Sequence, residues 1–342
     1  MKKIRIACAA AALVAAIVLL SNAARSVETP EATAHHELSA TQGLNAATLP
    51  VLKRVALDQN TVADALVRRL RPGASVQKNK MGNRLHVTAG TWHLLVTSDG
   101  ASADFHDTAV EQRAHSLGLP IANKMSSAAI IQKGREVIAS QLASQITLAS
   151  GETLVALRTD YRIEEGVDVH SKQTTSKVVA NRVVFTRAIA GVHVVGKGSK
   201  VSIVFSNDGT LESFHYDWPK YTSAAGQKTA APEELVSRVQ KAALARTGET
   251  TPPAKFDLHI RKPSAFPITA STKTQIQSMD CGYYDDGFKD SMPQAIQPGC
   301  TYQAIVLGPN GIRDGVEGAV PAGESFTVDD AWPETRVLLK AK

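Results

Sequence analysis

The chain has 342 residues with 43% hydrophobic content, enough to bury more than one core, so two or three domains are expected. Its 38 Lys and Arg residues exceed its 32 Asp and Glu residues, but loss of a basic leader containing Lys2, Lys3 and Arg5 would leave 35 against 32. The basic residues are scattered along the chain. Nucleic acid is therefore not expected as a partner, because phosphate binding needs a concentrated basic face.

Residues 1–24 have the layout of a secretory signal peptide. Basic residues precede the apolar run Ile6–Leu20, and small residues follow it up to Ala23 and Ala24. The run is shorter than the roughly 20 residues that a membrane-spanning helix needs. We expect cleavage after Ala23 or Ala24 and a mature protein that is secreted or periplasmic, with no transmembrane segment. An uncleaved N-terminal anchor is the alternative.

A flexible tether and a first folded unit are expected next. Residues 25–48 lack any periodicity, which is typical of a tether. The first α+β unit is predicted over residues 49–125. Asn60 can cap a helix over Thr61–Arg71 that a Pro-Gly pair ends, and two strand-like runs follow.

A second α+β unit over residues 126–220 carries the clearest strand pattern. Ser126 or Ser127 can cap a helix with one apolar stripe. Downstream, apolar and polar residues alternate on both sides of a Gly-rich middle, as in half-buried strands that the helix would cover. The sequence "NDG" at Asn207–Gly209 can form a tight turn. The positions that define the two strand faces are Val183, Phe185 and Arg187, and Val201, Ile203 and Phe205.

This unit resembles the PepSY and fungalysin/thermolysin propeptide family. In that family a helix is followed by V-x-F-x-R-x-x-x-G-V-x-V-x-G, a strand and an Asp-Gly turn. The resemblance covers about residues 126–218, and the insertion "KGS" before the second strand departs from the pattern. The matching positions are Val183, Phe185, Arg187, Gly191, Val192, Val194, Gly196, Asp208, Gly209 and Leu211.

The resemblance implies a binding or inhibitory role. Family members next to a peptidase act as propeptides that inhibit it, and free-standing modules are thought to modulate proteases or bind envelope components. This sequence has no H-E-x-x-H motif, and the residues after Pro219 are too few for the family's peptidase domain. We therefore expect a protein partner such as a secreted protease, bound along a strand edge at Val183–Ile189 or Val201–Phe205 through backbone hydrogen bonds.

A shorter stretch upstream is similar to the central one. "LVTSDGASADFHD" at Leu95–Asp107 and "VFSNDGTLESFHYD" at Val204–Asp217 share Asp-Gly and, at the same offset, Phe-His. This similarity favours two copies of one unit, the first degraded, with chance as the alternative. Altogether the sequence predicts an α+β fold, a helix packed on an antiparallel β-meander, in two or three related units.

No motif for catalysis, a cofactor or a metal is apparent. G-x-S-x-G and the P-loop spacing are absent from the sequence. Alternation places His215 and Asp217 on one strand face as part of a polar site, although a solvent-facing strand end with Trp218 as a core residue is favoured. We predict a non-enzymatic protein without cofactor or metal. A hydrolase with a triad from distant positions and a structural envelope protein are the alternatives.

The last third is predicted to follow a linker at residues 221–231. The C-terminal unit, residues 232–342, begins with a helix from Pro232 and continues with strands. Cys281 and Cys300 are expected to form one disulfide across a turn-rich loop, worth about 3 kcal/mol. The loop's carboxylates do not match a calcium-loop pattern, so solvated turn residues are favoured over a Ca²⁺ site. These carboxylates are Asp280, Asp285, Asp286 and Asp290.

Overall fold

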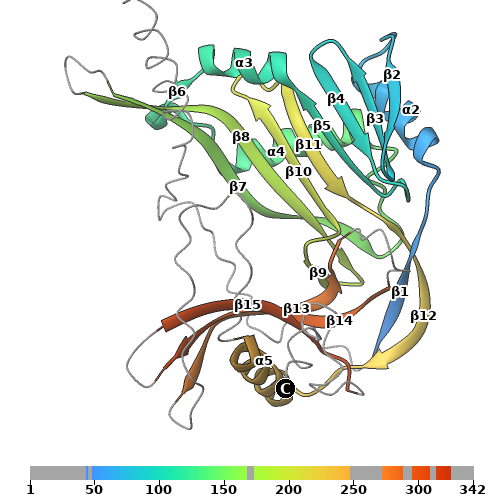
Figure 1. Ribbon diagram of the computed structural model, residues 1–342, viewed down its shortest axis with the longest axis vertical. Helices are drawn as coiled ribbons and strands as arrows, with labels where there is room; N and C mark the ends of the chain where they lie inside the picture. Colours follow the sequence, from blue (N-terminus) through green and yellow to red (C-terminus); the bar gives the residue numbers. More distant parts are fainter. Residues whose placement is uncertain are drawn as a thin grey trace, which may run out of the picture.

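The computed structural model describes residues 44, 48–167, 173–246, 272–287, 295–308 and 313–324. The predicted signal peptide and most of the predicted tether lie outside them. The described residues are mostly β, with 54% strand against 24% helix. They form one mixed sheet of 15 strands, so the predicted α+β fold of a helix on a simple meander is wrong (Figure 1). The difference arises because segments expected to be irregular are strands that join the units into one sheet.

The strands follow one another along the chain in four groups. The first group is β1 (Thr48–Val55), β2 (Gln77–Met81), β3 (Arg84–Ala89), β4 (Trp92–Val96) and β5 (Ser102–Asp107). The second is β6 (Leu119–Pro120), β7 (Glu152–Val167), β8 (Thr174–Ile189), β9 (Val192–Gly196), β10 (Lys200–Ser206) and β11 (Leu211–Asp217). The linker predicted at 221–231 is largely strand β12 (Lys220–Lys228). The last group is β13 (Lys273–Asp285), β14 (Ala295–Leu307) and β15 (Arg313–Pro321).

The strand order differs from the chain order. Along the sheet it is β12-β1-β14-β13-β9-β8-β10-β11-β5-β4-β3-β2, with β15 on β14 and with β6 and β7 on β8. The N-terminal strand β1 therefore pairs with β12 and β14, far from its neighbours in sequence. Most pairs are antiparallel, and the C-terminal strands join the rest through the parallel pair β13–β9.

Three of the described helices begin at polar caps. In α2 (Gln59–Leu70) the cap is Asp58, two residues before the predicted Asn60, and it accepts from the Thr61 N–H. In α4 (Ser127–Val137) the cap is Ser126, one of the two serines predicted. The unpredicted α3 (Thr108–Ser116) is capped by Asp107. The chain continues past α4 in the π-helical turn η3 (Ile138–Leu142). A short 3₁₀ helix, η2 (Ile121–Asn123), precedes α4. None of the described helices is both long and apolar enough to span a membrane.

The main core lies between one face of the sheet and helices α2 and α4. The α4 stripe and the inward side chains of β8 and β10 are buried together. A Cβ on Gly134 of α4 would lie 2.5 Å from Val183 Cγ1 and 2.9 Å from Phe185 Cε2, so only glycine lets the helix approach this closely. The predicted helix-over-strand packing is therefore present locally, as one part of the larger sheet.

A second core lies under α5 (Pro232–Arg246), which covers β13, β14 and β15. The predicted disulfide is confirmed, and it lies in this core. Cys281 and Cys300 face each other across β13 and β14, so the expected turn-rich loop begins and ends as an antiparallel ladder. The glycines and prolines of this segment had suggested turns, whereas the ladder is continuous through Gly282, Gly299 and Pro298.

Two hairpins, β4–β5 and β10–β11, lie side by side because β5 pairs with β11. Phe105 lies opposite Phe214, with ring centroids 5.5 Å apart in a stacked arrangement. Because the pairing is antiparallel, the residue after each phenylalanine, His106 or His215, faces the residue before the other one. The repeat of the two stretches stays a prediction.

The turns of the two hairpins are also built alike. Asp99 and Asp208 each accept a hydrogen bond from the backbone N–H two residues on, at 3.1 and 2.9 Å. The following Gly100 and Gly209 have φ of +64° and +81°, a conformation that glycine adopts without strain. The Asp-Gly pairs recognised in sequence therefore make equivalent turns.

Candidate functional site

The strands predicted to offer a binding edge lie inside the sheet. β8 pairs with β7 on one side and with β10 on the other, and β10 also pairs with β11. Both backbone sides of each strand are thus already hydrogen-bonded, so neither is an edge. Their predicted contact side chains form core: Val183, Phe185, Val201, Ile203 and Phe205 are fully buried, and Arg187 is 1% exposed.

A free edge lies one strand further out, at β7. This strand has 16 residues and pairs along its length with β8, from Glu152 opposite Ile189 to Val167 opposite Thr174. No other strand among the described residues pairs with it. Figure 1 shows β7 at the margin of the sheet. A row of backbone N–H and C=O groups is therefore left for another chain.

After Glu152, the first part of this edge is uncharged. A register shift between Ala156 and Arg158 leaves Leu157 without a Cα partner in β8, and Leu157 is 48% exposed. Beyond the shift the strand carries charged side chains, such as Arg162, whose guanidinium holds the Glu212 carboxylate at 2.6 and 2.8 Å. Charges and bulges are ordinary protection against unwanted edge pairing. We name the uncharged part, Thr153–Leu157, the β7 docking segment.

A buried charged cluster joins the distant strands. We name it the Arg54 cluster: Arg54 of β1, Asp217 of β11, Asp285 of β13, Tyr221 of β12 and Ser199 between β9 and β10. Arg54 Nη2 lies 2.6 Å from Asp217 Oδ2 and 3.1 Å from Asp285 Oδ1. Asp285 Oδ2 accepts from Tyr221 Oη at 2.6 Å and from Ser199 Oγ at 2.9 Å. The cluster therefore ties five segments together.

Glycine makes this cluster possible. A Cβ on Gly198 would lie 2.3 Å from Asp285 Cγ, closer than atoms can approach, and the Gly198 N–H donates to the Asp285 carbonyl at 2.8 Å. The "KGS" insertion, which departs from the PepSY-like pattern, thus places Gly198 and Ser199 around this carboxylate. Its glycine serves close packing, in agreement with the absence of a P-loop spacing.

The pKa values of the two carboxylates in the cluster are shifted in opposite directions. Burial, together with the negative charge of Asp285, raises the pKa of Asp217 to about 6. Burial acts to raise the pKa of Asp285 too, but Arg54 and the hydroxyl donors outweigh it and lower that pKa. Shifted pKa values mark both functional and structural clusters. Here the charged atoms are almost fully buried and bind each other, which suits a junction between strands.

The structure separates the predicted polar pair His215 and Asp217. His215 has a side chain that is 52% exposed, with Nδ1 2.6 Å from Asp104 Oδ1. Asp217 is buried in the Arg54 cluster. Trp218 is 2% exposed, and its Nε1 donates to the Thr147 carbonyl at 3.0 Å, so the core role favoured from sequence is the one observed.

Arg187, matched to the family pattern, holds the start of β7. Its Nη1 lies 3.2 Å from Glu152 Oε1, and its Nη2 donates to the Pro219 carbonyl at 2.9 Å. The guanidinium carbon lies 4.0 Å from the centre of the Trp218 ring, within cation–π range. Arg187 therefore positions the β7 edge without contacting a partner itself.

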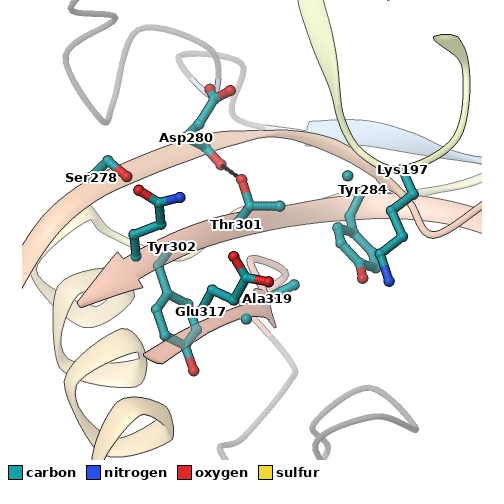
Figure 2. A pocket seen from close by; sticks show the side chains of 11 residues that line it. Lys197, Ser278, Asp280, Tyr284, Thr301, Tyr302, Glu317 and Ala319 are labelled. Atoms are coloured by element: carbon teal, nitrogen blue, oxygen red, sulfur yellow. Dashed lines mark hydrogen bonds between the residues drawn. The ribbon is translucent and has the colours of Figure 1, made fainter. Parts of the chain in front are cut away.

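A polar groove of about 320 Å³ lies on the C-terminal strands (Figure 2). By strand alternation Ser278 and Asp280 point away from the face that α5 covers. Burial raises the pKa of Asp280. No histidine or cysteine is among the described residues that line the groove. Its polar side chains include Lys197, Ser278, Asp280, Thr301, Gln303 and Glu317.

The aspartates of the disulfide segment do not converge. Asp280 lines the groove, Asp285 belongs to the Arg54 cluster, and Asp286 Oδ1 accepts from Tyr284 Oη at 3.1 Å. Asp290 lies outside the described residues. Over the described ranges, no three Asp, Glu, His or Cys side chains are arranged to hold a metal ion. The absence of a metal in this protein stays a prediction.

Sequence reasoning missed Arg54, the centre of the cluster. A usable signal was present, because Arg54 follows Leu52 at the spacing of one strand face, and Leu52 is 4% exposed. A charged residue on the apolar face of a strand needs a buried counter-charge. The sequence does not indicate where along the chain that partner lies.

Comparisons with models of known protein families and with curated proteins give no match. The PepSY-like resemblance of residues 126–218 therefore stays a prediction based on the quoted motif. The propeptide role of that family is used below only as part of a proposal.

Proposed function

We propose that this protein is a secreted, non-enzymatic binding protein of the propeptide type, which holds an extended segment of a protease against β7. The observation that carries this proposal is that β7, from Glu152 to Val167, pairs with a neighbouring strand on one side only among the described strands. An extended peptide can add to such an edge through main-chain hydrogen bonds, while side-chain contacts give selectivity.

The β7 docking segment is suited to this addition. Leu154 and Ala156 pack against the main core, which fixes the strand in place. Arg187 holds its beginning through Glu152. The exposed Leu157 offers an apolar contact that an added strand would cover. A rigid, preformed edge lowers the ordering cost of binding.

The opposite margin of the sheet is a poorer candidate. β2 has five residues, all exposed, and it carries Lys78 and Lys80. Lysines on a short edge strand discourage pairing, since the incoming chain would have to desolvate their charges. The contrast between β2 and β7 supplies a matched control.

The test compares Leu157→Asp with Met81→Asp, in which an equally exposed apolar side chain on β2 is replaced; Met81 is 57% exposed. A protease recovered with the wild-type protein from culture supernatant would be assayed for inhibition by each form. We expect Leu157→Asp to weaken inhibition about tenfold or more, corresponding to about 1.4 kcal/mol, because the carboxylate would be desolvated in the complex. Met81→Asp should inhibit like the wild type.

Equal inhibition by wild type and Leu157→Asp would contradict the β7 site. Rapid cleavage of the wild-type protein without inhibition would contradict the propeptide-type role as a whole. Circular dichroism of each variant would show that the fold is retained.

A further inference from the structure

The polar groove on the C-terminal strands has the size of a small-ligand site. Its volume of about 320 Å³ is at the lower end of the roughly 300–1,000 Å³ that such sites have. The described residues that line it come from the end of β9, the turn that follows β9, and strands β13, β14 and β15. Among the described residues, the groove therefore shares none with the proposed protease-binding edge at β7.

The strand register gathers four hydrogen-bonding side chains on the floor of this groove. Ser278 lies opposite Gln303, and Asp280 lies opposite Thr301. Opposite residues of an antiparallel pair point to the same face, as do residues two apart on one strand. With strands about 4.8 Å apart and alternate residues about 6.8 Å apart, the four side chains start from a patch of about 5 by 7 Å. We name these four residues the groove floor.

The groove floor is held in place from behind and from one end. The face behind it belongs to the core under α5, and the Cys281–Cys300 disulfide joins β13 and β14 one residue beyond it. At one end, Figure 2 shows Lys197 on the turn after β9. A Cβ on Gly196 would lie 2.4 Å from the Asp285 carbonyl oxygen, so glycine lets this turn pack against the end of β13. The groove is therefore preformed, which lowers the ordering cost of binding a ligand.

The lining offers hydrogen-bond donors and acceptors together. The Asp280 carboxylate accepts, the Lys197 ammonium donates, and the hydroxyl and amide side chains of the groove floor do both. Thr301 Oγ1 lies 3.4 Å from the Asp280 carbonyl oxygen, longer than a usual O–H···O bond, so this hydroxyl can turn to a ligand (Figure 2). A ligand hydroxyl group also donates and accepts, and it therefore suits this lining.

Other classes of small ligand fit the groove less well. An anion such as phosphate would meet the Asp280 and Glu317 carboxylates, with Lys197 as the one cation among the described lining residues. A cationic amine cannot accept hydrogen bonds from the lysine, hydroxyl and amide donors. An apolar ligand would bury these polar groups without hydrogen bonds, at a cost for each of them.

We infer that this groove binds a neutral saccharide of one or two sugar rings. Neighbouring hydroxyl groups of one ring reach adjacent side chains of the groove floor, since a pyranose ring with its hydroxyl groups spans a patch of this size. The Asp280 carboxylate accepts the strongest of these hydrogen bonds, because bonds to a charged group exceed those between neutral groups. The Gln303 amide bonds a hydroxyl group at the other end of the groove floor.

The test is saturation-transfer-difference NMR of the full chain, followed by titration of each disaccharide that gives a signal. The neutral probes are maltose, cellobiose, lactose and N,N′-diacetylchitobiose, which differ in linkage and ring substituents. The charged probes are putrescine and inorganic phosphate. The variants are Asp280→Asn and Gln303→Ala. The control is Gln275→Ala, because Gln275 is also an exposed glutamine of these strands and does not line the groove.

We expect saturation transfer to at least one of the four disaccharides. Asp280→Asn should lower the affinity about tenfold or more, since it removes the charged acceptor. Gln303→Ala should lower it about threefold or more, since it removes neutral hydrogen bonds. Gln275→Ala should bind like the wild type. Leu157→Asp should also bind the disaccharide like the wild type, so this result does not depend on the protease-binding proposal.

Three outcomes would overturn the inference: no transfer to any of the four disaccharides, transfer to putrescine or phosphate in their place, and an affinity that is unchanged in both Asp280→Asn and Gln303→Ala. An equal loss of affinity in Gln275→Ala would also contradict the assignment to this groove. If circular dichroism shows that a variant is unfolded, Ser278→Ala serves in its place, with the same outcomes.

Discussion

The β4–β5 and β10–β11 hairpins have similar Asp-Gly turns, yet the two turns lie in different surroundings. Asp99 Oδ2 lies 3.7 Å from Nη1 of Arg54, whose side chain is 6% exposed. Asp208 Oδ2 lies 3.2 Å from Nη2 of Arg113, whose side chain is 52% exposed. The same Asp-Gly sequence thus faces a buried arginine in one hairpin and a solvated one in the other. Local sequence determines the turn, whereas neighbouring strands determine what its charge contributes.

Replacing each of the two arginines by alanine, one at a time, should give the largest difference in unfolding free energy between the hairpins. Arg54→Ala leaves the buried carboxylates of Asp217 and Asp285 without their counter-charge, which should cost about 3–5 kcal/mol of unfolding free energy. Arg113→Ala should cost at most about 1 kcal/mol, because exposed ion pairs contribute little. Urea unfolding of the two variants checks this. Similar losses in both would mean that burial does not distinguish the hairpins.

Stability should also depend on pH through Asp217, at the end of the β10–β11 hairpin. The corresponding residue after the β4–β5 hairpin is Thr108, which does not titrate. With its pKa raised to about 6, Asp217 binds its proton more tightly in the folded chain. Its contribution is therefore complete below about pH 4 and is lost as the pH rises through about 6, by at most about 3 kcal/mol. The lowered pKa of Asp285 acts oppositely, since its contribution is lost as the pH falls.

Unfolding measured from pH 4 to pH 7 should show this decline in the wild type and not in Asp217→Asn. An equal slope in both proteins would assign the pH dependence to other groups.

The smallest effect concerns the histidines that follow the two phenylalanines. His215 pairs with Asp104 at 2.6 Å, and His106 pairs with Glu111 at 3.0 Å. The hydrogen bond of the His215 ring to the Asp104 carboxylate raises the pKa of His215. The stability that this pair contributes is therefore present at low pH and is lost as the pH rises through that raised value. A double-mutant cycle of His215→Ala and Asp104→Ala should give a coupling of at most about 1 kcal/mol. A larger coupling at pH 8 than at pH 5 would contradict the assignment.

Elements that are decided by nearby residues could be predicted from the sequence. Ser126 begins α4, Pro232 begins α5, and the Asp-Gly pairs form turns as expected. The Cys281–Cys300 disulfide could be predicted because only these two cysteines follow Cys8 in the sequence. The caps and turns depend only on residues within one short segment, and the disulfide depends only on the number of cysteines.

Elements that are decided by distant strands could not be predicted. The small, polar residues of Lys220–Lys228 suggest a linker, and they form β12 because β1 supplies the ladder. The apolar alternation around Val183 correctly predicted a strand, but the strand is buried on both faces instead of one. The pattern also did not predict that β7 and β10 would take both of its edges. Periodicity identifies a strand and its buried face, and it carries no information on which strand lies beside it. The Arg54 cluster was missed for the same reason.

Strand β1 gives the chain an unusual order of assembly. Leu52 pairs with Ser223 on one side and with Ile296 on the other, so β1 is completed by strands that are synthesised much later. Closing such long loops is slow compared with forming local hairpins. The local hairpins should therefore form first, and refolding should end in a slow step as β1 inserts between β12 and β14.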